Sequence, residues 1–280
     1  MMSLETYNIH NPFNNKLVGS VPIANEDTID ALFNDILNAE IKLSINEKKS
    51  ILQKTANKLN QNKEKFANLI SLESGLSLKD TIYEIGRVIN CAKYSIKVCD
   101  YVNRDLTDNF LIDNENKPEL SVIREPLDLA LAITPFNHPM NQVAHKIFPA
   151  LIAGTKVILK PSEKTPLSAI KLLEIMYDSG MPRNLIKIIT TDNPSFLLNK
   201  LLSKGHFDMV TFTGGLEAGL KIKRALVENN HLLTKYVPEL GGSSSLIVCD
   251  DADLDLAVKN ILNGCFKNSG QRCTSIRRVI

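Results

Sequence analysis

The sequence predicts an α/β fold built on a doubly wound parallel sheet, with helices preceding the sheet. Three observations lead to this expectation. From residue 129 onward, short apolar runs alternate with helical patterns, which is the rhythm of strand–helix–strand units. Residues 27 to 100 instead carry apolar residues at helical spacing. A chain of 280 residues is long enough for one large domain or one and a half ordinary ones.

The N-terminal region is expected to be helical because its apolar residues recur every three or four positions. The residues that share a helical face are, in chain order, Leu32, Ile36 and Leu37; Ile51, Leu52, Ala56 and Leu59; Phe66, Leu69 and Ile70; and Ile82, Ile85, Ile89 and Ala92. Residues 104–126 are polar and rich in turn-forming Asn, Asp and Pro. We therefore expect an extended arm or hairpin there.

Strands and helices are expected to alternate from residue 129. The expected strands are residues 129–133, 156–159, 185–190, 209–212, 245–249 and 276–280, and helices are expected up to about 153, from Thr165-Pro166, near 194–203 and 217–229, and from about 254. Thr165-Pro166 has the pattern of a helix cap followed by a first-turn proline. Ligands of doubly wound sheets bind at the carboxyl ends of strands. The turns after Ile133, Leu159 and Phe212 are therefore the expected binding site.

Composition and charge exclude several function classes. The net charge of +2 gives no electrostatic reason to expect nucleic acid or a membrane surface as a partner. The sequence has no apolar run long enough to span a bilayer and no visible secretory signal. Its five cysteines are widely spaced, without a C-x-x-C pair or zinc spacing, which fits a reduced compartment. We expect a cytoplasmic protein that acts on a small molecule and holds no metal.

Cys273 is the candidate nucleophile. It follows a glycine turn in the run Ser269-Gly270-Gln271-Arg272-Cys273-Thr274, whose small and polar residues favour an exposed thiol. A free thiol with a pKa of about 8.5 is mostly protonated at neutral pH, and the neighbouring Arg272 is one source of stabilisation for the thiolate. The alternative interpretation is a small buried apolar residue. That alternative is our expectation for the cysteines inside apolar runs, Cys91, Cys99, Cys249 and Cys265.

Glu239 and Asn137 are candidates for general-base and oxyanion-binding roles. Glu239 precedes Gly241 and Gly242, so its carboxylate can project into a cleft with backbone packed closely behind it. A solvated charge at a strand end is the alternative. Asn137 lies between Pro135 and Pro139, which restrict the backbone on both sides. Its amide can then donate to a developing oxyanion, and an ordinary turn is the alternative.

These motifs together resemble the aldehyde dehydrogenase superfamily. The resemblance extends over essentially the whole chain, because further segments are similar to the family's opening strands and to an early helix. Those segments are Asn11-Pro12-Phe13, Leu17-Val18-Gly19 and Leu72-Glu73-Ser74-Gly75. The runs Tyr83-Glu84-Ile85-Gly86-Arg87 and Pro135-Phe136-Asn137-His138-Pro139, with the cysteine run above, are similar to the phosphonoacetaldehyde, lactaldehyde and non-phosphorylating glyceraldehyde-3-phosphate dehydrogenases.

The resemblance implies a domain organisation. Residues 1–240 would form a Rossmann-like NAD(P)-binding domain that includes an oligomerisation arm at 104–126. Residues 241–280 would be the incomplete start of a second, catalytic α/β domain, because in relatives a large part of that domain follows the cysteine. Here seven residues follow it. Apolar surface on the helix from about residue 254 would then have no cover.

The resemblance also implies site residues. Cys273 would attack an aldehyde, Asn137 would stabilise the oxyanion, and Glu239 would activate water. The positions that match the NAD or NADP site are Thr134, Pro135, Phe136, Lys160, Ser162, Glu163, Gly214, Gly215 and Leu240, with Lys160 and Glu163 on the adenosine ribose. Two departures from the family are Gly215, where serine is common, and Thr190-Thr191-Asp192, where relatives usually have glycine.

The resemblance further implies an anionic aldehyde as substrate, carrying a phosphonate, phosphate or carboxylate. Arg87, His138 and Arg272 match positions that can line such a pocket, and surface salt bridges are the alternative for the two arginines. Three interpretations of the chain stay open. It is one piece of a dehydrogenase that works with a companion polypeptide, or an inactive cofactor-binding or interaction module, alone or as a homo-oligomer. The third is a decayed gene product that does not fold stably.

Overall fold

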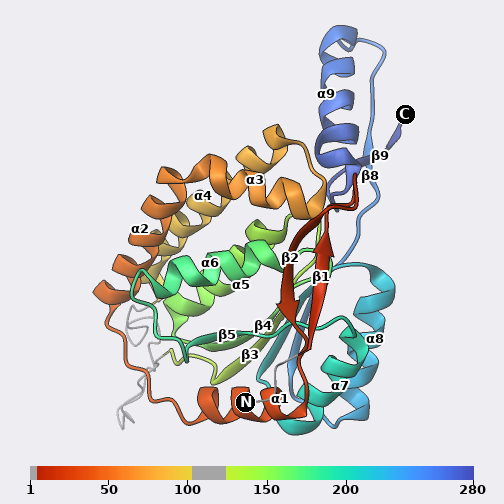
Figure 1. Ribbon diagram of the computed structural model, residues 1–280. Coiled ribbons are helices and arrows are strands. Elements are labelled where there is room, and N and C mark those ends of the chain that lie inside the picture. The colour runs from red at the N-terminus through yellow and green to blue at the C-terminus, as the bar shows by residue number, and fades with distance from the viewer. Residues whose placement is uncertain (1–4, 103–123) are drawn as a thin grey trace, which may run out of the picture.

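A five-stranded parallel sheet forms the centre of the protein, whose computed structural model describes residues 5–102 and 124–280 (Figure 1). The strands are β3 (Leu129–Ile133), β4 (Lys156–Lys160), β5 (Ile186–Ile188), β6 (Met209–Thr213) and β7 (Lys235–Glu239), in the spatial order β5-β4-β3-β6-β7. All of β3 is buried, as expected of a central strand with helices on both faces. The predicted α/β class is confirmed.

The order of the strands reverses between β3 and β6. After β3 the chain adds β4 and β5 on one side and then returns to add β6 and β7 on the other. Ile133, at the end of β3, pairs with Lys160 of β4 and with Phe212 of β6. Such a reversal is where doubly wound sheets bind their ligands. The three turns that the sequence indicated therefore meet at one edge of the sheet.

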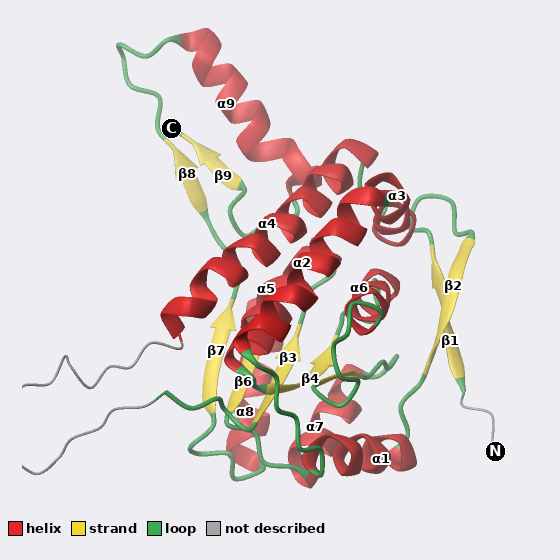
Figure 2. Ribbon diagram, turned by 90° about the vertical axis from the view of Figure 1, so that its left-hand side faces the viewer, coloured by secondary structure: helices red, strands yellow, loops and turns green. Residues whose placement is uncertain are grey.

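Helices cover the two faces of the sheet and form two separate cores. α5 (Pro139–Ala153) and α6 (Leu167–Tyr177) cover one face, and α7 (Pro194–Lys204) and α8 (Leu216–Glu228) cover the other (Figures 1 and 2). Ala130 and Ala132 of β3 belong to the first core, whereas Leu129, Leu131 and Ile133 belong to the second. This division follows from the alternation of side chains along a strand.

Four helices precede the sheet, as predicted for residues 27–100. They are α1 (Glu26–Leu37), α2 (Ile45–Gln61), α3 (Lys63–Ser74) and α4 (Leu78–Val102). α2, α3 and α4 pack with α5 and α6 in the first core, while α1 joins the second. Within the described ranges, no helix has the length and apolar character needed to cross a membrane. Apart from residues 124–126, the expected arm at 104–126 lies outside the described residues.

An antiparallel hairpin opens the described chain. It consists of β1 (Thr6–His10) and β2 (Leu17–Pro22). The expectation that residues 11–13 are part of a strand was wrong. The side chain of Asn11 accepts hydrogen bonds from the backbone N–H groups of Phe13 and Asn14, at 2.9 and 3.2 Å, and this local bonding favours a turn over a strand.

The start of α6 also differs from expectation. Thr165 does not cap the helix, and the N-cap residue Pro166 makes no side-chain hydrogen bond. The carboxylate of Glu73, from α3, instead accepts the N–H groups of Leu167 and Ser168 at 2.8 and 3.0 Å. A buried acid from another helix thus satisfies the donors that a local cap would otherwise take.

The C-terminal extension, residues 241–280, projects from the sheet region (Figures 1 and 2). It contains β8 (Ser244–Leu246), α9 (Leu254–Phe266), the 3₁₀ turn η2 (Lys267–Gly270) and β9 (Ile276–Val279), with β8 and β9 paired in parallel. The expected strand at 245–249 is therefore shorter and begins one residue earlier. None of the residues of α9 is buried. The domain boundary near residue 240 stays a prediction.

Candidate active site

Cys273 and Glu239 line the same cavity, which has a volume of about 630 Å³. The cavity lies between α5 and the strands β6 and β7, and Thr213 and Leu240 form part of its wall. Both Cys273 and Glu239 are exposed. The thiol-bearing residue therefore borders open space beside a carboxylate and is not packed in the interior.

Gly242 brings the chain after β7 into direct contact with the backbone of Cys273. A Cβ atom at position 242 would lie 2.0 Å from the carbonyl oxygen of Cys273, whereas one at Gly241 would meet nothing within 4 Å. Only glycine permits this approach without a backbone shift. Of the two glycines behind Glu239, Gly242 thus allows the Cys273 segment to pack against the chain that follows β7.

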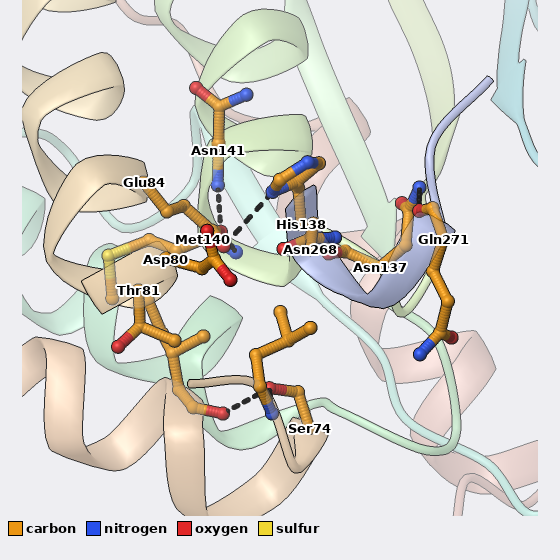
Figure 3. Close-up of polar contacts among 12 residues, drawn as sticks. Ser74, Asp80, Thr81, Glu84, Asn137, His138, Met140, Asn141, Asn268 and Gln271 are labelled. Carbon is orange, nitrogen blue, oxygen red and sulfur yellow. Dashed lines mark hydrogen bonds and ion pairs between the residues drawn. The ribbon is translucent and has the colours of Figure 1, made fainter. Parts of the chain in front are cut away.

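Asn137 is joined to the segment before Cys273 by reciprocal side-chain hydrogen bonds. Its Nδ2 donates to the carbonyl oxygen of Gln271 at 2.6 Å, and Nδ2 of Asn268 donates to the carbonyl oxygen of Asn137 at 3.0 Å (Figure 3). In this arrangement the Asn137 amide is already engaged, two residues from Cys273. The segments that carry Asn137 and Cys273, which are distant in sequence, are therefore joined directly, and Cys273 shares a cavity with Glu239.

Three consecutive residues with positive φ deliver the chain to Cys273. Asn268, Ser269 and Gly270 have φ values of 57°, 54° and 68°. Glycine adopts this region freely, but asparagine and serine do so only at a cost. The side chain of Asn268 is buried and bound to Asn137, so a tertiary contact holds the turn.

His138 lies inside the protein and not in the cavity. Its Nδ1 is 3.3 Å from Oε2 of Glu84, while Oε1 of Glu84 accepts the N–H groups of Met140 and Asn141, each at 3.0 Å (Figure 3). Glu84 is fully buried, and its carboxylate offsets the positive end of the α5 dipole. His138 thus helps to fix the start of α5, and its expected contact with substrate is not what this geometry provides.

The two arginines that were expected to line the substrate pocket lie in different places in the structure. Arg87, on α4, lines the cavity of Cys273. The guanidinium of Arg272 instead donates to the carbonyl oxygens of Asn263 and Gly264, at 3.1 and 2.9 Å. These carbonyls belong to the last turn of α9, where a cation is favourable. Arg272 therefore caps a helix and does not line the cavity.

A second cavity, of about 330 Å³, occupies the reversal point of the strand order. It contains every residue of the expected cofactor set except Leu240. They are Thr134, Pro135, Phe136, Lys160, Ser162, Glu163, Gly214 and Gly215. A Cβ atom at Gly215 would meet nothing within 4 Å, and Gly215 is the N-cap of α8 without a side-chain hydrogen bond. The first N–H groups of α8 can therefore donate to an anionic ligand.

Lys160 and Glu163 form an ion pair in this second cavity, with Nζ and Oε2 separated by 3.2 Å. Burial lowers the pKa of Lys160 below its ordinary value, and the charge of Glu163 offsets only part of this effect. Burial alone would raise the pKa of Glu163, but Lys160 and hydrogen bonds outweigh it and keep the pKa below its ordinary value. The pair thus presents a charged donor and a charged acceptor to a ligand's hydroxyl groups.

Lys146 is a site residue that the sequence analysis missed. It lines the cavity with Cys273 and Glu239, and its Nζ donates to Oγ1 of Thr211 at 2.8 Å. Burial lowers the pKa of Lys146 to about 8, and the negative charge of Glu239 partly offsets this shift. His145 and Gln142, on the same helix, also face the cavity. Gln142, His145 and Lys146 are spaced three and four residues apart, which places them on one face of α5, and this spacing was the signal that could have revealed them.

The structure also shows the exposure of the other four cysteines. Cys91 and Cys99 are buried as expected, but Cys249 is exposed and Cys265 is half-buried. The expectation of burial was wrong for Cys249, because no segment among the described residues packs over this part of the extension. In the part of the chain that the structure describes, no group of His, Cys, Asp or Glu has the geometry of a metal site.

Comparison with known proteins agrees with this fold. The family model described as "Aldehyde dehydrogenase family" matches residues 2–280. The chain therefore belongs to the aldehyde dehydrogenase family. A related sequence, NADP-dependent glyceraldehyde-3-phosphate dehydrogenase of Streptococcus equinus, is 32% identical over 285 residues, which are 100% of this chain and 58% of that protein. Lactaldehyde dehydrogenase of Methanococcus aeolicus is 30% identical over 279 residues, which are 97% of this chain and 57% of that protein.

Solved structures of the same family superimpose closely. NADP-dependent glyceraldehyde-3-phosphate dehydrogenase of Bacillus halodurans C-125, complexed with NADP, gives a TM-score of 0.87 at 33% identity, over 98% of this chain and 57% of that one. A point mutant of betaine aldehyde dehydrogenase from Staphylococcus aureus, in complex with NAD+, gives 0.88 at 29% identity, over 98% and 55%. The chain spans about half the length of the relatives that it matches.

Proposed function

We propose that this chain is the cofactor-binding and nucleophile-bearing part of an NAD(P)-dependent dehydrogenase that oxidises an aldehyde to a carboxylic acid. One observation carries this proposal: Cys273 and Glu239 line one cavity, which adjoins the cavity at the strand reversal at Thr213, and Asn137 is bonded two residues from Cys273. The related structures bound to NADP and NAD+ support the cofactor class. Both nucleotides stay open for this chain.

The cavity at the strand reversal has the features that a dinucleotide needs. Lys160 and Glu163 would hold ribose hydroxyls, and the start of α8 behind Gly215 would receive the pyrophosphate. When bound, the nicotinamide supplies the acceptor for the hydride that leaves the aldehyde carbon. The protein's own residues would then perform the other steps, which are addition to the carbonyl, oxyanion binding and hydrolysis.

Those residues would act in two stages. The Cys273 thiolate adds to the aldehyde carbon, and the Asn137 amide and the Cys273 backbone N–H donate to the oxygen, which becomes negative. After the carbon has been oxidised to a thioester, Glu239 removes a proton from water, which attacks the carbonyl carbon. The carboxylic acid leaves and the thiolate is restored. Because the Asn137 amide donates to Gln271 in the present structure, it must exchange that acceptor for the substrate oxygen.

A second candidate is a cofactor-binding or interaction module without turnover. Its supporting observation is the C-terminal extension, where large apolar side chains are exposed, among them Leu254, Leu262 and Phe266. Contiguous apolar surface of this kind is typical of an interface. The companion chain or homo-oligomer that would cover it is part of this proposal.

Spectroscopic measurement of NAD(P)H formation separates the two candidates. We expect the purified chain alone to bind NAD or NADP without turnover, and to form NAD(P)H from an aldehyde once a polypeptide that corresponds to the unmatched part of the relatives is added. Cys273→Ala should abolish this activity, whereas Cys249→Ala, which changes an exposed cysteine of the extension, should leave it unchanged. Cofactor binding that never leads to turnover would favour the module. Failure of calorimetry to detect any nucleotide binding would reject the dehydrogenase and the cofactor-binding module, and would favour an interaction module.

A further inference from the structure

Lys267, the C-cap residue of α9, contacts the aromatic ring of Tyr83 on α4. Its Nζ lies 3.5 Å from the centroid of that ring, well inside the limit of about 6 Å within which a cation and an aromatic face attract each other. The other Lys and Arg residues that face aromatic rings in the described part of the chain lie 4.7 to 6.0 Å from the centroids. Lys267 takes part in none of the ion pairs among the described residues, so the Tyr83 ring is the partner of its charge.

This contact completes a closed network of contacts around the start of α5. Six residues form the network as three pairs of chain neighbours, which are Tyr83-Glu84 on α4, Asn137-His138 before α5, and Lys267-Asn268 at η2. Oε2 of Glu84 lies 3.3 Å from Nδ1 of His138 (Figure 3). Nδ2 of Asn268 donates to the carbonyl oxygen of Asn137 at 3.0 Å. With the contact between Lys267 and Tyr83, the network ties α4, the loop before α5 and η2 to one another.

The Tyr83–Lys267 contact is the part of this network that borders solvent. Glu84, His138 and Asn268 are 0%, 7% and 1% exposed, whereas Tyr83 is 51% exposed and Lys267 is half-buried. None of the residues of α9 is buried, so this helix cannot fix the position of its own C-terminal end. That end is therefore held from outside the helix, by the loop before α5 on the buried side and by Tyr83 on the solvent side.

We propose that Tyr83 and Lys267 are positioning residues, which hold η2 against α4 and thereby place the thiol of Cys273. Cys273 follows Lys267 by six residues, and the intervening segment leads directly from η2 to the cavity. Neither Tyr83 nor Lys267 lines that cavity, so the pair acts through the segment and not on a substrate. The inference rests on the proposed function only where it takes Cys273 as the nucleophile.

Amide hydrogen exchange of this segment tests the proposal without cofactor or turnover. The backbone N–H of Gln271 donates to the carbonyl oxygen of Asn268 at 3.0 Å, and that of Ser275 donates to the carbonyl oxygen of Arg272 at 3.2 Å. Exchange at these two amides, followed by NMR, therefore reports local opening of the segment. The substituted positions do not adjoin either amide in the chain, so the intrinsic exchange rates stay the same.

Two variants remove the contact from opposite sides. Lys267→Met keeps an unbranched apolar side chain and removes the charge, and Tyr83→Leu keeps an apolar residue and removes the ring. Each should raise the exchange rates of Gln271 and Ser275 by roughly two- to fivefold, the effect of a cation–π contact at a partly exposed site. The double variant should show little further increase, because both substitutions remove the same interaction. The rate of Cys273 alkylation by iodoacetamide should change in the same variants.

Conservative variants separate a cation–π contact from ordinary packing. Tyr83→Phe keeps an aromatic face and Lys267→Arg keeps a cation, so both should retain the original exchange and alkylation rates. Lys259→Met is the matched control, because it removes the same charge from an exposed position of α9 and should alter neither rate. Circular dichroism confirms that each variant is folded.

Exchange at Gln271 and Ser275 that is equally fast in Lys267→Met and in the original protein would overturn the assignment. So would an alkylation rate of Cys273 that both loss variants leave unaltered, or a Tyr83→Phe variant that behaves like Tyr83→Leu. The proposed dehydrogenase function fails separately, through the absence of nucleotide binding. Faster exchange in the two loss variants of a protein that binds no nucleotide would support the positioning contact and reject the enzyme.

Discussion

The sheet region and the C-terminal extension differ in how their apolar residues are covered, although one chain forms both. In the sheet region, helices from both sides bury β3 completely. In the extension, α9 has an apolar content comparable to that of α5 in the sheet region, but none of the residues of α9 is buried. A helix in a protein gains most of its stability from packing, not from propensity. The comparison indicates that the first region supports its own fold, while the extension depends on contacts that these residues do not make among themselves.

The largest expected effect contrasts two leucines, one in each region. Leu131 of β3 is 0% exposed, whereas Leu256 of α9 is 55% exposed. Leu131→Ala should lower the free energy of unfolding by about 2–5 kcal/mol because it leaves a cavity in a packed core. Leu256→Ala should change it by less than about 0.5 kcal/mol. Urea denaturation of both variants measures this, and similar losses would show that the two regions are equally well packed.

An intermediate effect is expected at the junction of the two regions. Gly242→Ala places a Cβ atom against the backbone of Cys273, while Gly241→Ala meets open space. Overpacking of this kind costs about 1–3 kcal/mol, so the Cys273 segment should detach from the end of the sheet in the first variant alone. The rate of Cys273 alkylation should change in Gly242→Ala and stay constant in Gly241→Ala. Identical rates in both variants would mean that this close approach does not position the thiol.

The smallest effect, taken as a change per pH unit, concerns a buried acid that ties two helices of the sheet region together. Burial raises the pKa of Glu73 from 4.5 to about 7, against the opposing hydrogen bonds from Ser168 and Leu167. Between these values the folded state binds more protons than the unfolded state. The stabilisation is therefore complete below pH 4.5 and is lost as the pH rises through about 7, by up to ~1.4 kcal/mol per pH unit.

Glu73→Gln removes the group that titrates, so the free energy of unfolding should depend less on pH between 4.5 and about 7. The free energy of unfolding, measured by urea denaturation at a series of pH values, should fall less steeply in the variant than in the original protein. Glu174→Gln, which changes an exposed residue of α6, serves as the control and should keep the original slope. If the free energy of unfolding changed with pH in the same way in Glu73→Gln and in the original protein, the raised pKa of Glu73 would be contradicted.

Sequence periodicity predicted the sheet region well because its elements are decided by local patterns of burial. The apolar runs at β3, β4 and β6 and the helical spacing of α2 and α4 correspond to observed elements. The motifs also predicted that the segments carrying Cys273, Glu239 and Asn137 would converge, since each lies next to the end of a strand or in a turn.

Several failures involve partners that a local pattern does not record, whether these lie eight or nine positions away, as for Arg272, or on a remote helix, as for α6. Thr165 was expected to cap α6, but Glu73, which arrives from α3, performs that task. Arg272 was expected near a substrate, but the carbonyl groups at the end of α9 hold its guanidinium. Cys249 has the sequence surroundings of a buried residue and yet is exposed. A local pattern records which residues prefer burial, but it does not record whether another segment is present to bury them.

The left-handed run at Asn268, Ser269 and Gly270 links the placement of the nucleophile to a remote loop. Serine in this conformation costs about 1 kcal/mol or more. The hydrogen bond from the Asn268 side chain to the carbonyl oxygen of Asn137 stabilises the turn against this cost. The position of the Cys273 thiol therefore depends on the loop at Asn137, which lies 131 positions before Asn268 in the chain. A displacement of that loop, by a ligand in the neighbouring crevice or by a substitution there, would be transmitted to the sulfur without any direct contact with it.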